Sequence, residues 1–92
     1  MGINEKNRQI TITGIIVSSD FDKRGNVIEV AIETETFGRY IVADNNKGQE
    51  LLNLIDKEVR AIGSISGEDI YGNSIIVISK YDLVRQTYFQ KN

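Results

Sequence analysis

Paired carboxylates are the first side chains in this sequence whose types and spacing could support a reaction. Glu33 and Glu35 lie two residues apart, and so do Asp20 and Asp22. Such pairs can act as general acid and base, or can hold a hard cation such as Ca²⁺. Glu33 and Glu35, however, share the solvent face of an expected strand, where no burial would raise a pKa. Asp20 and Asp22 lack the further acids of calcium loops. We therefore expect no enzyme activity and no metal site.

The residue inventory excludes several other kinds of chemistry. The sequence has no Cys and no His, so disulfides, thiolate catalysis, Ser-His-Asp catalysis and imidazole-bound metals are excluded. No cofactor is expected. Eleven Lys and Arg stand against thirteen Asp and Glu, which gives a formal charge of -2. A nucleic-acid binder normally shows a net basic face, although a local basic patch can sit on a neutral protein.

The length of 92 residues predicts a single domain, 1–92, with a core over about 8–84, a polar arm 1–8 and a polar tail 85–92. A chain of this size buries only ~60–65% of its unfolded surface, so the core must be small. No apolar run is long enough to span a bilayer, and the start of the sequence lacks the apolar segment of a signal peptide. We expect no membrane partner and a cytoplasmic location by default; a mature exported form would look the same. The sequence does not indicate an oligomeric state.

Two expected strands carry an interior glycine, at residues 11–16 (TITGII) and 60–65 (RAIGSI). Ile10 and Ile12, before Gly14, share one parity, and Ile15 and Val17, after it, share the other, although Ile16 blurs the change. A change of parity at a glycine is typical of a β-bulge, which bends the strand. The alternative is a glycine at a point where another backbone passes close to the strand.

Residues 27–35 (VIEVAIETE) alternate between apolar and polar side chains. Ile28, Val30 and Ile32 share one parity, which predicts a half-buried strand with these three facing inward. The outer face of this strand would then carry the carboxylates Glu29, Glu33 and Glu35. A short third strand, 39–44 (RYIVAD), follows a tight turn at 36–38, and its parity allows Tyr40 to face either the core or the solvent.

Residues 44–58 change to a helical period. An apolar stripe predicts a short amphipathic helix capped by Asn45 or Asn46; the stripe consists of Leu51, Leu52, Leu54 and Ile55. Two further strands complete the order β-β-β-α-β-β. The first and last hairpins echo each other, because each has a glycine in its first strand and Gly-Asn at its turn, but they are too diverged to indicate a duplication.

Five short strands avoid unpaired edges by closing into a barrel, and closure needs strand curvature at bulges or glycines. We therefore expect Gly14 and Gly63 to be the structural residues at which the first and fourth strands turn, and the helix to close the open end. The predicted fold is all-β with one helix, a five-stranded Greek-key OB-fold barrel. A split barrel of another topology is the competing fold.

The chain resembles OB-fold proteins over residues 8–84, through ITITGII, VRAIGSI, KGQELLNLI and IIVISKYDLV. Among these it is similar to small bacterial single-domain proteins grouped as tRNA-anticodon-binding-like OB domains, many of unknown function. The resemblance implies a ligand on the outer face of strands two and three, between the loops 18–26 and 67–73. Bases would stack there on aromatic residues, and phosphates would meet Lys and Arg. The candidate ligand-binding residues are Phe21, Lys23, Arg24, Phe37, Arg39, Tyr40 and Tyr71.

The acidic outer strand argues against nucleic acid, because carboxylates would face the approaching phosphates. Each candidate also has a structural interpretation, in which aromatic residues cover the barrel and the cations are ordinary turn charges. We therefore expect a non-enzymatic binding or interaction module whose partner is a protein or a small ligand. The alternative is a protein that binds single-stranded nucleic acid, either RNA or DNA.

Overall fold

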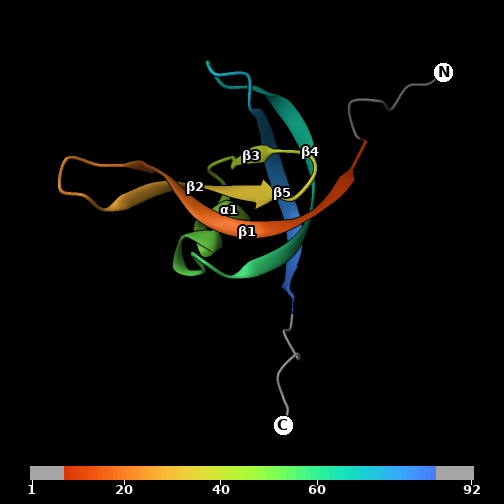
Figure 1. The fold of residues 1–92 in the computed structure, drawn as a ribbon, viewed down its shortest axis with the longest axis horizontal. Helices are drawn as coiled ribbons and strands as arrows, with labels where there is room; N and C mark the ends of the chain where they lie inside the picture. Colours follow the sequence, from red (N-terminus) through yellow and green to blue (C-terminus); the bar gives the residue numbers. More distant parts are fainter. Residues whose placement is uncertain (1–7, 85–92) are drawn as a thin grey trace, which may run out of the picture.

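The computed structural model describes residues 8–84 (Figure 1). Its elements are β1 Ile10–Phe21, β2 Val27–Thr34, β3 Arg39–Val42, α1 Asn46–Glu50, the 3-10 turn η2 Leu51–Asn53, β4 Glu58–Glu68 and β5 Ser74–Leu83. The strands close in the order β1-β2-β3-β5-β4, with β4 pairing back onto β1. This is the five-stranded OB-fold barrel, and the predicted element order is confirmed. The predicted tail, 85–92, and the predicted arm apart from Arg8 lie outside the described residues.

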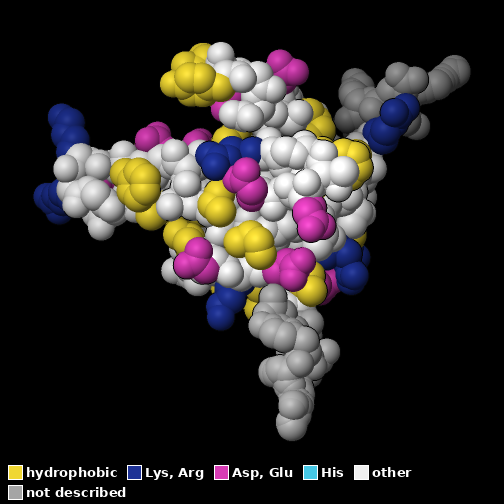
Figure 2. All heavy atoms as spheres, in the orientation of Figure 1, with side chains coloured by type: hydrophobic (Ala, Val, Ile, Leu, Met, Phe, Trp, Pro, Cys, Tyr) yellow, Lys and Arg dark blue, Asp and Glu magenta, His cyan; other side chains and the backbone are white. Residues whose placement is uncertain are grey.

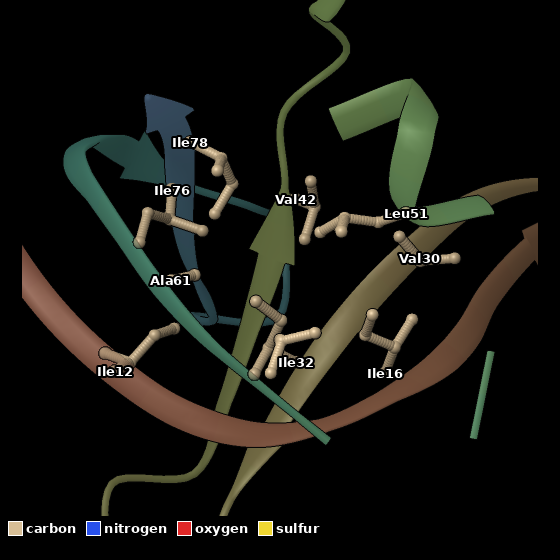
Figure 3. Close-up of a cluster of buried hydrophobic side chains, with 10 residues drawn as sticks. Ile12, Ile16, Val30, Ile32, Val42, Leu51, Ala61, Ile76 and Ile78 are labelled. Atoms are coloured by element: carbon tan, nitrogen blue, oxygen red, sulfur yellow. The ribbon is translucent and has the colours of Figure 1, made fainter. Parts of the chain in front are cut away.

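The core fills the inside of the barrel with branched aliphatic side chains (Figure 3). Val30 and Ile32 are buried there, as the alternation in β2 predicts. The inward prediction for Ile28 is wrong, because 53% of this residue is exposed. The ladder between β1 and β2 pairs Asp20 with Glu29 and then Phe21 with Val27, so Ile28 is the extra residue of a bulge. A bulged residue is displaced from the regular alternation of faces, which explains its exposure.

Gly14 lies where β1 is paired on both sides, with Thr34 of β2 and Val59 of β4. The register is regular through this position and Ile12, Gly14 and Ile16 share the buried parity, so the predicted bulge is wrong. The alternative is what the structure shows. A Cβ at Gly14 would lie 2.4 Å from the carbonyl oxygen of Glu33. The glycine therefore permits close approach of β2.

Gly63 lies beside an irregularity, but the extra residue is on the neighbouring strand. Ile62 pairs with Lys80 and Gly63 with Ile78, which leaves Ser79 of β5 unpaired. The Ser79 hydroxyl donates to the carbonyl oxygen of Ile62 at 3.0 Å. A Cβ at Gly63 would lie 2.2 Å from the carbonyl oxygen of Val77. A bulge therefore lies beside Gly63, but its extra residue belongs to β5 and not to the fourth strand.

The helical segment is shorter than expected and closes one end of the barrel. Asn45 is the N-cap: its Oδ1 accepts from the N–H of Gly48 at 2.7 Å, and its Nδ2 donates to the carbonyl oxygen of Ile78 at 3.2 Å. Of the predicted apolar stripe, only Leu51 is fully buried, and the other three pack against the core in part. Leu51 points towards Val30 and Val42 in Figure 3.

A second contact ties α1 to β5. The Tyr81 hydroxyl donates to Oε1 of Glu50 at 2.8 Å. This hydrogen bond to a carboxylate, together with partial burial and the Glu50 charge, raises the pKa of Tyr81 above its usual value of 10.0. Lys47 Nζ lies 5.9 Å from the Tyr81 ring centroid, within the range of a cation–π interaction.

Candidate ligand-binding surface

The β1–β2 hairpin ends in a turn that is built by one aspartate. Oδ1 of Asp22 accepts from the backbone N–H of Arg24 at 2.8 Å and of Asn26 at 2.9 Å. Nδ2 of Asn26 donates to Oδ2 of Asp22 at 3.2 Å. Gly25 takes a φ of 89°, which favours glycine. Asp, Gly and Asn thus fix this turn, and the side chains of Lys23 and Arg24 are free of it.

The β4–β5 hairpin ends in the same turn. Oδ1 of Asp69 accepts from the N–H of Tyr71 at 2.8 Å and of Asn73 at 2.9 Å, and Nδ2 of Asn73 donates to Oδ2 at 3.1 Å. Gly72 has a φ of 86°. The two turns share the pattern Asp-x-x-Gly-Asn, as DKRGN and DIYGN. The sequence echo at Gly-Asn pointed to this likeness, but the aspartate at the start of each turn was missed.

The two turns display different residue pairs. Lys23 and Arg24 are exposed at the tip of the β1–β2 hairpin, and the tip of the β4–β5 hairpin exposes 89% of Ile70 and 82% of Tyr71. Figure 2 shows the Lys and Arg side chains at the end of the hairpin on the left and a hydrophobic cluster on the upper hairpin. Lys23, Arg24 and Tyr71 were predicted site residues. Ile70 was not, although it occupies the turn position equivalent to Lys23.

Stability should fall in acid because of these two turns. The pKa of Asp22 is lowered by the hydrogen bonds from Asn26 and, to a lesser extent, from the N–H groups of Arg24 and Gly25. At Asp69 desolvation acts to raise the pKa, but the hydrogen bonds from Asn73, Tyr71 and Gly72 together outweigh it and lower the pKa. A folded pKa below the unfolded value adds stability above the unfolded pKa, and that stability is lost as the pH falls through the folded pKa.

We expect the double variant D22N/D69N to show a flatter loss of stability than the native chain between about pH 5 and pH 2. Urea unfolding followed by circular dichroism at each pH measures this. E35Q, which removes an exposed carboxylate outside the turns, is the control. A native slope retained in D22N/D69N would show that these aspartates do not drive the acid response.

The predicted aromatic residues do not form one stacking surface. Tyr40 packs against the core, beside Val42 of the same inward parity. Phe21 is 51% exposed at the end of β1, whereas Phe37 is 74% exposed in the turn after β2. The eight residues of β2 separate them by about 20 Å or more. Aromatic residues that far apart cannot stack adjacent bases.

The predicted cation on β3 is already paired. Nη2 of Arg39 lies 2.9 Å from Oε1 of Glu33, and Arg39 Nε donates to the same oxygen at 3.0 Å. Oε1 of Glu29 accepts from the Ser19 hydroxyl at 3.2 Å. Glu35 lies beyond the end of β2 at Thr34, so the outer face of the strand carries two of the three predicted carboxylates. Arg39 is therefore neutralised on the face where it would meet a phosphate.

An apolar row crosses this outer face, and the sequence interpretation missed it. Ala31 and Ile41 pair with each other across β2 and β3, and both are buried, although their parity is opposite to that of the core residues. Val17 of β1 and Ile75 of β5 continue the row on either side. These apolar side chains are neighbours across four strands, which helps to bury Ala31 and Ile41 on the outer face. The sequence does not show the strand registers that bring them together.

Within residues 8–84, no cluster of three or more acidic side chains could hold a metal ion. None of the helices described there has the length and apolar character that a membrane-spanning helix requires. Comparison with the models of known protein families finds no match, and no curated protein is significantly similar to this chain.

Proposed function

We propose that this chain is a protein-binding module of the OB-fold type. The observation that carries the proposal is the Ile70–Tyr71 tip, in which two large apolar side chains stand in water on a turn fixed by Asp69. Aromatic and aliphatic side chains that fill a pocket on the partner are the usual anchors of protein interfaces. A hydrogen-bonded turn presents them with little ordering cost.

Single-stranded nucleic acid is the second candidate, and Lys23 and Arg24 favour it together with Tyr71. The outer face argues against it. Tyr40 faces inward, Arg39 is bound to Glu33, and no described feature joins the cationic tip to the aromatic tip. Membership of the bacterial group of tRNA-anticodon-binding-like OB domains remains a prediction.

The two turns provide a matched experiment, because I70S/Y71S and K23S/R24S change equivalent positions of the same turn. We expect I70S/Y71S to lower the recovery of bound partner proteins by at least about tenfold, since an interface anchor is worth about 2 kcal/mol or more. K23S/R24S should retain them. Quantitative affinity enrichment from an extract of the source cells measures this.

Labelled single-stranded DNA and RNA, titrated at low salt by fluorescence anisotropy, provide the other half of the test. The protein-binding proposal expects no binding, and low salt is where electrostatic binding is strongest. Oligonucleotide binding that is lost in K23S/R24S, with partner recovery unchanged in I70S/Y71S, would replace our proposal with the nucleic-acid alternative.

A further inference from the structure

A groove of about 690 Å³ runs along the first half of β1, away from both turns. One wall is residues 11–15 of β1, and the other is residues 33–37, which include the end of β2 and the turn that follows it; Glu58 completes the lining. Figure 1 shows why the groove exists: the red end of β1 runs past the point of the β2 arrow. We call this feature the β1 groove.

The floor of the β1 groove is an open strand edge. Backbone N–H and C=O groups of successive strand residues point to opposite sides. At Ile16 the N–H donates to the carbonyl oxygen of Lys57 at 2.9 Å, and the carbonyl oxygen accepts from the N–H of Asp56 at 2.8 Å. Ile16 and the even-numbered residues before it therefore bond towards β4. The backbone N–H and C=O groups of the odd-numbered Thr11 and Thr13 point the other way, towards the line of β2.

Along that line β2 has already ended. The pairing of β1 with β2 starts at Gly14 and Thr34, so no described strand lies beside Thr11 or beside the N–H of Thr13. On its other side β1 is paired with β4 from Ile10 onwards, which holds this edge in place. An ordered strand edge with unused donors and acceptors is a template for one more strand.

The side chains around this open edge are acidic, which favours an added strand that carries positive charge. The lining residues include the carboxylates of Glu33, Glu35 and Glu58 and contain no Lys or Arg. Arg39 pairs with Glu33 alone. Phe37, 74% exposed, adds an apolar contact at the same wall. Complementary charge across an interface directs encounter and suppresses wrong partners.

We propose that the β1 groove binds an extended, lysine- or arginine-bearing segment of a partner protein as a sixth strand beside Thr11 and Thr13. The segment's main chain bonds to the open edge, and its cationic side chains reach the glutamates. A second copy of this chain is the wrong occupant, because edge-to-edge pairing would bring two sets of the same carboxylates together. The proposal does not depend on the Ile70–Tyr71 tip.

Four synthetic seven-residue peptides test this, each titrated to millimolar concentration into ¹⁵N-labelled protein. One alternates Lys with Val, and the second alternates Glu with Val. The third and fourth are Lys–Val peptides with N-methyl groups on alternate residues, one peptide for each of the two possible phases. We expect the Lys–Val peptide to shift the amide signals of Thr11 and Thr13 and to slow their hydrogen exchange, and the Glu–Val peptide to bind at least about tenfold more weakly.

N-methylation should abolish binding in one phase and spare it in the other, because only one edge of the added strand faces β1. The protein variant E35K/E58K should weaken binding of the Lys–Val peptide about five- to tenfold, as expected for two partly exposed ion pairs, while I70S/Y71S should leave this binding unchanged.

Binding of both methylated peptides would overturn the proposal that the segment adds as a strand. Equal binding of the Glu–Val peptide would overturn the cationic partner. If amide hydrogen exchange at Thr11 and Thr13 slows as the protein concentration rises, with no peptide present, a second copy of this chain would be the occupant of the β1 groove. Unshifted Thr11 and Thr13 amides would overturn the site.

Discussion

Replacing Gly63 with alanine is expected to destabilise the barrel by about 3 kcal/mol, the upper range for overpacking a close contact. An added Cβ would lie 2.2 Å from the carbonyl oxygen of Val77 and 2.9 Å from its carbon, distances that no rotamer change can relieve. Val77 cannot move away easily, because the β4–β5 ladder continues on both sides of it. Gly14 faces the same problem, with the carbonyl oxygen of Glu33 at 2.4 Å, so G14A should behave alike.

The free energy of unfolding of G63A and G14A, from urea titrations, measures this effect. S66A and T13A are the controls, since each creates an alanine at an exposed position of the same strand. A domain of this size has about 5–10 kcal/mol of stability, so the glycine variants should lose a large share of it. Glycine variants as stable as their controls would show that the strands can separate at these points without cost.

Leu51→Ala should have a comparable effect, a loss of about 3 kcal/mol, because it removes a fully buried side chain and leaves a cavity. Leu51 enters the barrel end from η2, at the one place where the helical segment contributes to the central cluster. The neighbouring Leu52 is only partly buried, so L52A is the matched control and should cost about 1 kcal/mol.

Thermal unfolding of both variants, followed by circular dichroism, separates the two positions. An L51A variant with the same melting temperature as L52A would mean that the barrel end collapses into the space that the Leu51 side chain leaves. In that case the helical segment would be a cover over the barrel and would contribute little to its core.

Short-range signals explain why so much of the fold could be predicted from sequence. The alternation around Val30 and Ile32, the cap at Asn45 and the Gly-Asn turns each depend on residues within a few positions of one another. Gly14 was misinterpreted because its neighbours are apolar on both faces of β1. Ile15 and Val17 are on the outer face, which made a regular strand look like a bulged one. The close approach of β2 that requires the glycine is a tertiary contact, which a strand pattern does not contain.

The surface was harder to predict because it depends on register. Neither orientation of Tyr40 could be excluded from a four-residue strand, and the pairing of Arg39 with Glu33 follows from the β2–β3 register. The bulge that exposes Ile28 and the end of β2 that opens the β1 groove are likewise products of how strands align. The aspartates of the two turns were readable in principle, since Asp precedes each Gly-Asn by the same spacing.

The shared turn has a consequence for how this barrel can change over time. Asp, Gly and Asn make every hydrogen bond of the turn, and the backbone but not the side chains of the two residues between them takes part. Exchange of Lys23-Arg24 with Ile70-Tyr71 would thus move charge from one hairpin to the other and leave the barrel intact. Each hairpin tip can therefore accept a different pair of residues, so substitutions there would change the exposed surface of descendants of this protein without altering any interior residue.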